Sequence, residues 1–289
     1  MLLGSQKIQY LFDSAKRYFD PIICPFCNSN TSVKIDQKYI FTRLFECNVC
    51  HLYYRHPIER VNNNKKFYQD EYVESDRITT SLPSSDELHE MMKNGFRNGN
   101  KNAQRYRDVL VKLFPDTPGL RIVDYGSSWG YISWQLMNFG FDVESYEISK
   151  PRALYGNKNL GLNILMDENE IRSENDVFFS SHVIEHHPSI SNMISLAKLK
   201  LKNGGYFIAI SPNGSKDYRN ADPIGFHHGW GKVHPNYLNV DFYKTIFKSM
   251  PFYIGSSPFD FEAIRPLTQG DQIIGDVSSE ELIVIAKII

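Results

Sequence analysis

The sequence has few of the features that mark a secreted, membrane-bound or nucleic-acid-coated protein. It has four cysteines in 289 residues, and its formal net charge is −1. A charge so close to zero argues against a surface coated with cations for nucleic acid, although it allows a local basic patch. No run approaches the roughly 20 apolar residues needed to cross a bilayer, and the apolar run at the N-terminus is too short for a signal peptide. We therefore expect a soluble, cytoplasmic protein without membrane insertion.

The composition is that of a globular chain with ample material for a core. Hydrophobic residues make up 42% of the sequence, and the 17 Tyr and 19 Phe supply large buried areas. A chain of this length can hold one large domain and a small one.

All four cysteines fall in one window, as Cys24-Pro-Phe-Cys27 and Cys47-Asn-Val-Cys50. Each Cys-x-x-Cys turn points two thiolates at one tetrahedral ion, and two such turns about twenty residues apart indicate a zinc ribbon. Residues 33–36 and 39–46 alternate like the hairpin of a ribbon. Two disulfides are disfavoured in a cytosolic protein, and a redox pair would not need the second turn. We predict one structural zinc held by Cys24, Cys27, Cys47 and Cys50; His51 is an alternative ligand, but four thiolates already close the site.

The stretch Ile122-Val-Asp-Tyr-Gly-Ser-Ser-Trp-Gly130 reads as a buried strand, a glycine turn and the start of a helix. Gly126 and Gly130 let the backbone pass close to a ligand, and the helix aims free N–H groups at the same crevice. Glu147 lies about twenty residues on, where a carboxylate can bond both ribose hydroxyls. The acid Asp124 before the first glycine suits a cationic ligand better than the pyrophosphate of a Gly-x-Gly-x-x-Gly fold. The chain has no Gly-x-x-x-x-Gly-Lys-Ser/Thr phosphate loop.

Strands and helices alternate regularly after Gly119, which implies a doubly wound α/β sheet with right-handed crossovers. The predicted strands are 120–125, 141–147, 162–165, 176–181, 206–210, 252–256 and a doubly buried terminal strand at 281–288. The predicted helices are 129–139, 150–160, 188–202 and 235–249, preceded by helices at 8–19, from Ser85 and at 100–113.

Four landmarks resemble class I S-adenosylmethionine (SAM) methyltransferases. The segment 124–130 is similar to their motif I, with Ser128 in place of the middle glycine. Ser180-Ser-His-Val-Ile-Glu-His-His-Pro188 resembles the HVLEHVPDP stretch of the UbiG-like branch and of many sugar methyltransferases. Residues 201–212 are similar to the LKPGGxLxIxxPN motif, and the terminal strand matches the inserted antiparallel seventh strand. The resemblance covers roughly residues 100–289 and implies a Rossmann-like, seven-stranded methyltransferase sheet after a small zinc-ribbon domain.

The resemblance also assigns contacts to SAM by position. Asp124 and the loop that follows should lie against the methionine part, and Glu147 should bind the ribose. Asp167 should reach the adenine amino group, with Glu168 and Glu170 as alternatives. The predicted cofactor-binding residues are Asp124, Gly126, Ser128, Gly130, Glu147, Ile148, Asp167, Ser180, Ser181 and His182.

A hydroxyl acceptor also needs a base, and histidine is the side chain suited to that near neutral pH. The candidates follow the fourth strand or lie in a glycine-rich loop at 225–235: His182, His186, His187, His227, His228 and His234. We predict that His182 or His234 is the catalytic base, with His186 as a third candidate whose Glu-His context favours a structural role. Each of these histidines has the alternative of a structural hydrogen bond. Two or three of the loop histidines also have the alternative of holding a divalent metal that lowers a hydroxyl pKa.

The chain is predicted to divide into a zinc ribbon with its N-terminal helix (1–60), a helical linker that caps the acceptor site (61–115) and a SAM-binding methyltransferase domain (116–289). We expect methylation of a small molecule, most simply a sugar hydroxyl in a nucleotide-sugar or surface-glycan pathway of carbohydrate biosynthesis. The side chains predicted to wall the acceptor site are Tyr68, Tyr72, Arg77, Arg97, Asn98 and Lys101.

Two other functions remain open from the sequence. An RNA methyltransferase would grip nucleic acid with its ribbon, yet residues 21–57 carry only scattered charge, and no Asn/Asp-Pro-Pro-Tyr/Phe motif follows the fourth strand. A non-catalytic partner that kept the fold would not need Asp124, Gly126, Gly130 and Glu147. The sequence does not indicate an oligomeric state.

Overall fold

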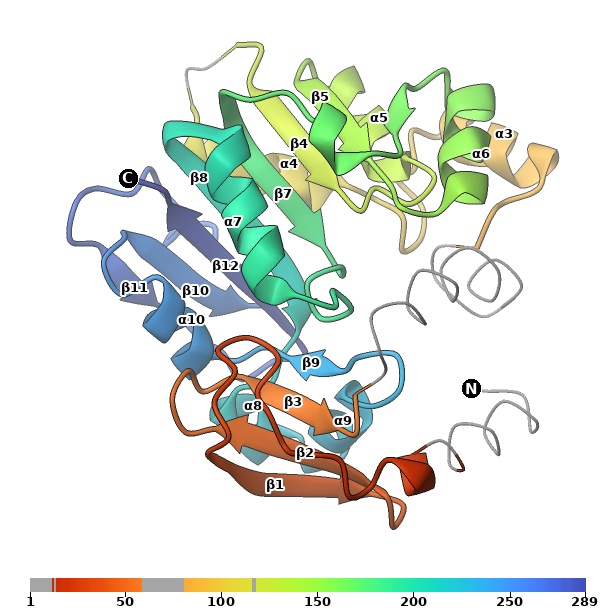
Figure 1. Cartoon of the computed structure of the whole chain (residues 1–289). Helices are drawn as coiled ribbons and strands as arrows, with labels where there is room; N and C mark the ends of the chain where they lie inside the picture. The colour runs from red at the N-terminus through yellow and green to blue at the C-terminus, as the bar shows by residue number, and fades with distance from the viewer. Residues whose placement is uncertain (1–11, 13, 59–80, 116–117) are drawn as a thin grey trace.

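The computed structural model describes residue 12 and residues 14–58, 81–115 and 118–289. These form two sheets, a large one with helices on both faces and a small one beside it (Figure 1). Residues 8–11 and 13 of the predicted N-terminal helix lie outside the described residues, whereas residues 12 and 14–16 are helical. The first part of the predicted helical linker, up to residue 80, also lies outside, and with it Tyr68, Tyr72 and Arg77. Within the described part, no helix is long and apolar enough to span a bilayer.

The large sheet has eight strands in the described part of the chain. They are β4 (Arg121–Tyr125), β5 (Asp142–Tyr146), β6 (Ile164–Leu165), β7 (Asn175–Ser181), β8 (Leu201–Pro212), β10 (Phe252–Ser256), β11 (Gln272–Ile274) and β12 (Glu281–Lys287). Their order is β11-β10-β12-β8-β7-β4-β5-β6. The strands from β8 to β6 are parallel, whereas β12 is antiparallel to both of its neighbours. The predicted doubly wound sheet with an inserted antiparallel strand is confirmed, and the short edge strand β11 adds an eighth.

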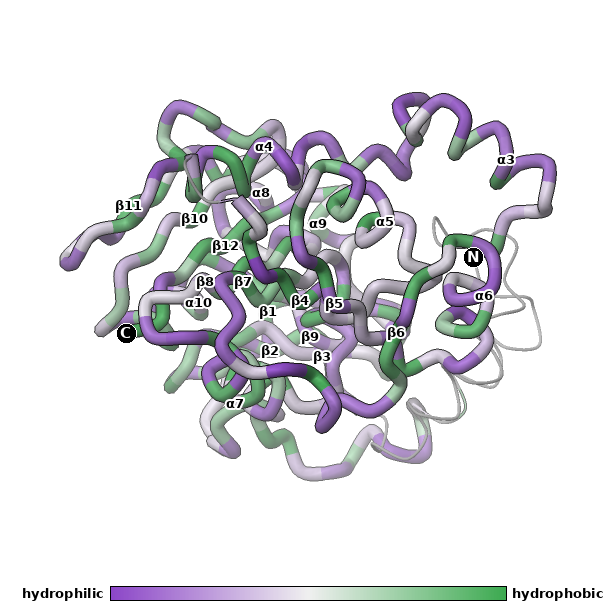
Figure 2. The backbone as a smooth tube through the Cα atoms, turned by 90° about the horizontal axis from the view of Figure 1, so that it is seen from above, coloured by the Kyte–Doolittle hydropathy of each residue, from purple (hydrophilic) through white to green (hydrophobic). Residues whose placement is uncertain are grey.

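Helices cover both faces of this sheet. They are α3 (Ser85–Lys93), α4 (Gln104–Leu113), α5 (Tyr131–Asn138), α6 (Lys150–Leu160), α7 (Ile190–Lys200) and α10 (Val240–Ile246). Val177 and Phe179 pack with apolar residues of α4 and α5, whereas Phe178 between them packs with those of α7 and α10. This alternation follows from the two-residue period of a strand. It makes β7 apolar on both faces, and hydrophobic residues run along the central strands in Figure 2.

Two predicted boundaries differ from the structure. The predicted helix to 202 ends at Lys200, and β8 begins at Leu201 and not at 206; its pairing register with β7 shifts between Asn175 and Val177. The predicted helix at 235–249 is wrong at its start, because Asn236–Tyr237 form strand β9 and α10 begins only at Val240. Asn239 caps α10 by accepting a hydrogen bond from the Phe242 N–H at 2.9 Å.

The small sheet has the order β1 (Ser32–Lys38), β2 (Thr42–Cys47), β3 (Tyr53–His56) and β9. The predicted ribbon hairpin is therefore present, and a strand from about 180 residues later in the chain extends it. Helices α8 (Lys216–Ala221) and α9 (Pro223–Gly229) lie beside the small sheet in Figure 1. Phe226 and Trp230 are buried there against Leu44 and Tyr53. The ribbon thus shares a core with a segment that follows β8.

Candidate functional site

The turn after β4 lies where the order of the large sheet reverses. The chain runs outward through β4, β5 and β6, and then returns to β7 on the other side of β4. Ligands of open α/β sheets bind outside the carboxyl ends of the strands at such a point. Three residues of the turn have positive φ: Gly126 (81°), Ser128 (54°) and Gly130 (81°). A Cβ on Gly126 would overlap methyl groups of Val183, and one on Gly130 would overlap a methyl group of Leu162. The positive φ, together with this close packing, favours glycine at both positions.

Glu147 fastens this turn to the next strand. Its carboxylate accepts hydrogen bonds from the Ser128 N–H at 2.8 Å and from the Ser149 N–H at 2.7 Å. The side chain is buried, and burial raises its pKa, while those N–H groups and nearby Arg152 oppose the rise. The Ile148 N–H also acts on this carboxylate. A carboxylate has about four acceptor positions, so these contacts still leave a position for a ribose hydroxyl.

Asp124 is buried at the base of the turn. It accepts a hydrogen bond from the Ser133 hydroxyl at 2.5 Å, which joins β4 to α5. Burial is the main cause that raises the pKa of Asp124 to about 7; the Ser133 bond opposes the rise and the charge of Glu147 adds to it. The sequence predicts that Asp124 lies beside a cationic ligand. Without such a ligand, burial disfavours the ionised form of this carboxyl group.

The remaining predicted cofactor residues lie at or after the carboxyl ends of the parallel strands. Ile148 packs against the main core cluster. Asp167 is exposed after β6 and caps the short 3₁₀ helix Glu168–Glu170. Ser180 is fully buried at the end of β7, and the Ser181 hydroxyl lies 3.1 Å from that of Tyr106. The structure therefore brings the predicted residues to one side of the sheet.

An aromatic cluster that the sequence reasoning did not identify supports the turn. Trp129 is fully buried, with its ring 6.1 Å from that of Phe96 and 5.1 Å from that of Tyr131. Phe96 follows α3, so the segment before the large sheet packs directly on the glycine turn. A cavity of about 490 Å³ opens on this segment; it is lined by Met92, Lys93, Asn94, Gly95, Arg97 and Asn98. Two of the predicted acceptor-wall residues, Arg97 and Asn98, are among them.

His182 lies in a line of charges at the carboxyl end of β7. Its Nε2 is 2.9 Å from a Glu281 oxygen and its Nδ1 is 3.5 Å from a Glu185 oxygen. Arg105 donates to both oxygens of Glu281, and its 3.0 Å contact is to the oxygen that also faces His182. Burial opposes protonation of His182, but the two glutamates raise its pKa to about 10. In this arrangement His182 is an imidazolium at neutral pH, and it supplies a charge instead of a free base.

His186 and His234 meet beside that line. Their rings are 4.8 Å apart. His186 Nδ1 is 2.5 Å from the Val233 carbonyl and His234 Nδ1 is 2.7 Å from the Gly229 carbonyl. Burial is the main cause that lowers the pKa of His186 to about 4, so its ring is neutral. The two predicted histidines from distant segments are thus brought together.

Three other histidines do not reach this cluster. His187 Nε2 lies 3.3 Å from the Tyr125 hydroxyl, and burial lowers the His187 pKa. His227 and His228 are not in a loop, as the glycine-rich sequence predicted, but on helix α9. His227 Nδ1 is 2.9 Å from an Asp36 oxygen of the ribbon, and His228 is exposed. The predicted position of these two over the sheet edge is wrong because Asp222 caps a helix there, accepting from the Gly225 N–H at 2.9 Å.

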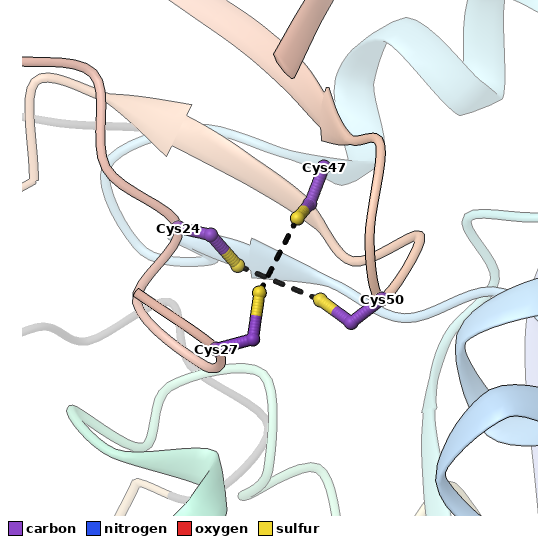
Figure 3. A group of neighbouring side chains, drawn as sticks. All are labelled: Cys24, Cys27, Cys47 and Cys50. Atoms are coloured by element: carbon purple, nitrogen blue, oxygen red, sulfur yellow. Dashed lines mark hydrogen bonds between the residues drawn. The ribbon is translucent and has the colours of Figure 1, made fainter. Parts of the chain in front are cut away.

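The four cysteines converge in the small sheet (Figure 3). All four Sγ atoms lie within 4.8 Å of one another, and the Cys24–Cys50 and Cys27–Cys47 separations are 3.5 and 3.4 Å. Zn–S bonds of about 2.3 Å in a tetrahedron place sulfurs about 3.8 Å apart, so these thiols fit one zinc ion. The cysteines are free thiols and not disulfides. His51 Nδ1 lies 3.2 Å from Glu46, outside the thiol cluster.

Comparisons with known proteins agree with the fold. No protein-family model matches the chain, and no curated protein matches its sequence. The plantazolicin methyltransferase BpumL, in complex with a pentazolic desmethylPZN analog and SAH, has a TM-score of 0.50 and 14% identity, covering 78% of this chain and 95% of that chain. Magnesium protoporphyrin IX methyltransferase (ChlM) from Synechocystis PCC 6803 has a TM-score of 0.49 and 14% identity over 80% of this chain and all of the other. The fold of the chain is the Rossmann-like fold of SAM-dependent methyltransferases.

We expect about one zinc ion per purified chain, with all four thiols protected from alkylation until the metal is removed. Cys24→Ser should reduce folding yield, because a structural zinc site contributes folding free energy directly. Metal analysis with thiol titration measures both effects. His51→Ala is the control and should keep its zinc, since His51 pairs with Glu46. Reactive thiols in a metal-free native protein would contradict the zinc assignment.

A second prediction concerns Asp124 and pH. The folded state raises its pKa to about 7, whereas an unfolded Asp titrates near 3.9. The fold therefore binds the extra proton, and its stability falls as pH rises from about 4 to about 7. Asp124→Asn removes this pH dependence, because the amide does not titrate. The difference in free energy of unfolding, variant minus wild type, should therefore increase by on the order of 2–3 kcal/mol from pH 5 to pH 8. Urea titrations of both proteins measure it; parallel pH profiles would show that Asp124 is not destabilised by burial.

Proposed function

We propose that this protein is a SAM-dependent methyltransferase that acts on a small molecule. The observation that carries the proposal is the glycine turn at the switch point of the sheet, fixed between two buried acids, Asp124 and Glu147. BpumL, whose fold this chain shares, was solved with SAH bound. SAM, when bound, supplies an activated methyl group on a cationic sulfonium.

Polar atoms around the turn support a polar ligand there. The hydroxyl groups of Ser127, Ser149 and Ser180 are buried without a hydrogen-bond partner. A buried hydroxyl without a partner costs free energy, and these three surround the carboxyl ends of β4, β5 and β7. The ribose hydroxyls and the amino-acid group of SAM would supply partners to such atoms. The residues present therefore fit the cofactor.

The finer proposal is that the acceptor is a hydroxyl, most simply that of a sugar in a nucleotide-sugar or surface-glycan pathway. A hydroxyl must lose its proton when it is methylated. Side chains that can accept this proton or stabilise the resulting charge lie near the carboxyl end of β7. His234 is the favoured base, since its Nδ1 is oriented to the Gly229 carbonyl and Nε2 is then the basic nitrogen. His182 would serve instead to hold charge, because it is ion-paired to Glu185 and Glu281.

The structure gives the RNA alternative little support. Of the four basic side chains on the ribbon strands, Arg55 is fully buried, and Lys38 donates to the carbonyls of Trp230 and His228. Arg43 also donates to a backbone carbonyl. Lys34 is the remaining exposed one. Nucleic-acid affinity depends on contacts to many phosphates, and the described ribbon presents too few cations for that.

Mass spectrometry of glycans and nucleotide sugars, from cells with and without the gene, tests the acceptor class. A metabolite that carries one more methyl group when the gene is present identifies the acceptor. A methylation difference in RNA, with glycans and nucleotide sugars unchanged, would favour the alternative.

Glu147→Ala should weaken SAM binding by roughly 1.5–3 kcal/mol, because it removes a charge-assisted bond to the ribose. Isothermal titration of the folded variant measures this loss. Glu144→Ala is the matched control, because Glu144 lies on β5 three residues before Glu147 and accepts from the Arg172 N–H; this variant should leave affinity for SAM unchanged. Equal affinity of Glu147→Ala and wild type would show that Glu147 does not hold the ribose.

His234→Ala should lower kcat by about 10²–10⁴-fold on the true acceptor, the usual size of general-base catalysis. SAM affinity should barely change, because the histidine acts on the acceptor. Turnover and SAM binding are measured together, with His228→Ala as the control because His228 is exposed on α9. Normal turnover of His234→Ala would leave the SAM fold intact but would exclude this histidine as the base.

A further inference from the structure

Three metal-ligating side chains meet at the carboxyl end of β7, apart from the cysteine cluster. The ligand atoms of Glu185, His186 and His234 all lie within 4.8 Å of one another. Glu185 and His186 follow β7, whereas His234 precedes β9. The Asn236 N–H and side-chain amide donate to the Glu185 carbonyl at 3.2 and 3.3 Å, which fixes the two segments together.

The Glu185 carboxylate is buried and poorly satisfied. The residue is fully buried, and neither carboxylate oxygen has a hydrogen-bond partner. The nearest basic nitrogens, on His182 and His186, are 3.5 and 3.6 Å from one oxygen, longer than a good hydrogen bond. A buried carboxylate loses its hydration, and it normally recovers that loss through hydrogen bonds or a cation.

Both histidines are oriented as metal ligands usually are. His186 Nδ1 is 2.5 Å from the Val233 carbonyl, and His234 Nδ1 is 2.7 Å from the Gly229 carbonyl. A ligating histidine typically donates its second ring N–H to a carbonyl or carboxylate in this way, which fixes the tautomer and presents Nε2 to the metal. His186 Nε2 is the ring nitrogen that faces Glu185.

We propose that Glu185, His186 and His234 bind one divalent transition-metal ion through a carboxylate oxygen and two Nε2 atoms. Two imidazoles and one carboxylate suit Mn²⁺, Fe²⁺, Co²⁺ or Zn²⁺, whereas Mg²⁺ and Ca²⁺ prefer oxygen ligands. Three protein ligands leave coordination positions open, as in catalytic sites. A hydroxyl that reached such an ion would have a lowered pKa. With the ion bound, His234 Nε2 is a ligand and the ion takes over the activation otherwise assigned to His234 as base; this role, unlike the binding itself, rests on the proposed function.

The test uses the full chain with its ribbon loaded with zinc. Mn²⁺ is added, and free Mn²⁺ is followed by electron paramagnetic resonance, while zinc content is measured before and after. We expect one Mn²⁺ per chain, with zinc unchanged. Glu185→Gln and His234→Ala should each weaken Mn²⁺ binding by more than the roughly 10–100-fold that follows loss of an outer-shell partner. His228→Ala, the matched control, should bind Mn²⁺ as wild type does, and Zn²⁺ should compete for the site where excess Mg²⁺ does not.

Absence of Mn²⁺ binding to the native chain would overturn the proposal, as would binding that both variants retain. If Glu185→Gln does not fold, His234→Ala decides the question, because His234 is partly exposed and its loss removes a single hydrogen bond. The assay needs neither SAM nor an acceptor. A negative result here therefore leaves the proposed methyltransferase function standing, and loss of that function would leave a positive metal result standing.

Discussion

The pairing of β9 with β3 is the interaction on which the arrangement of the site depends. Tyr53 pairs with Tyr237, and the Arg55 N–H donates to the Pro235 carbonyl at 2.8 Å. This places a strand from the large domain at the edge of the cysteine ribbon. His234 comes two residues before β9, so its position is set from the ribbon side. On the other side, Asn236 holds the Glu185 backbone.

The ribbon is therefore more than an appended module. Its thiol cluster fixes the turns from which β3 emerges, and the Asn239 amide donates to the His51 carbonyl directly after the second turn at 2.8 Å. Trp230 buries its ring against the ribbon and donates from Nε1 to Asp36 at 2.8 Å. Loss of ribbon structure would release the segment that carries His234. The ribbon and the segment that carries His234 are thus joined through backbone and side-chain contacts.

The glycine turn and the histidine edge, by which we mean His182, His186 and His234 at the carboxyl end of β7, differ in how their charges are balanced. The turn contains Asp124 and Glu147, two buried acids whose pKa values burial raises, and they hold backbone N–H groups and a hydroxyl. A cation bound nearby would favour their charged forms. The histidine edge is instead a line of alternating charges, in which Arg105 and His182 balance Glu281 and Glu185. These ion pairs hold the four charged side chains in fixed positions next to the apolar core.

The sequence by itself determined the elements whose signals are local. The alternation of apolar runs with helical segments predicted the strands of a doubly wound sheet, because parallel strands joined by helices admit few topologies. Asp124, Gly126, Gly130 and Glu147 follow from spacing along one strand–turn–helix unit, and the cysteine turns follow from theirs. The terminal strand could be predicted from its continuous apolar run. That run arises because Ile283 and Val284 face opposite sides of the sheet and both are buried.

Only the tertiary structure decided which distant side chains meet. Glu281 reaches His182 because β12 runs antiparallel to β8, so that its first residue pairs with Pro212 at the carboxyl end. Glu185 was visible in the sequence only as a part of a motif, and its burial beside His234 depends on β9 joining the ribbon. Residues 235–237 read as helix from their neighbours, yet strand pairing overrides that local preference. Contacts between segments far apart in the chain leave no local pattern. For that reason the glycine turn and the candidate histidines could be predicted, whereas the contacts of those histidines with Glu185, with Glu281 and with one another could not.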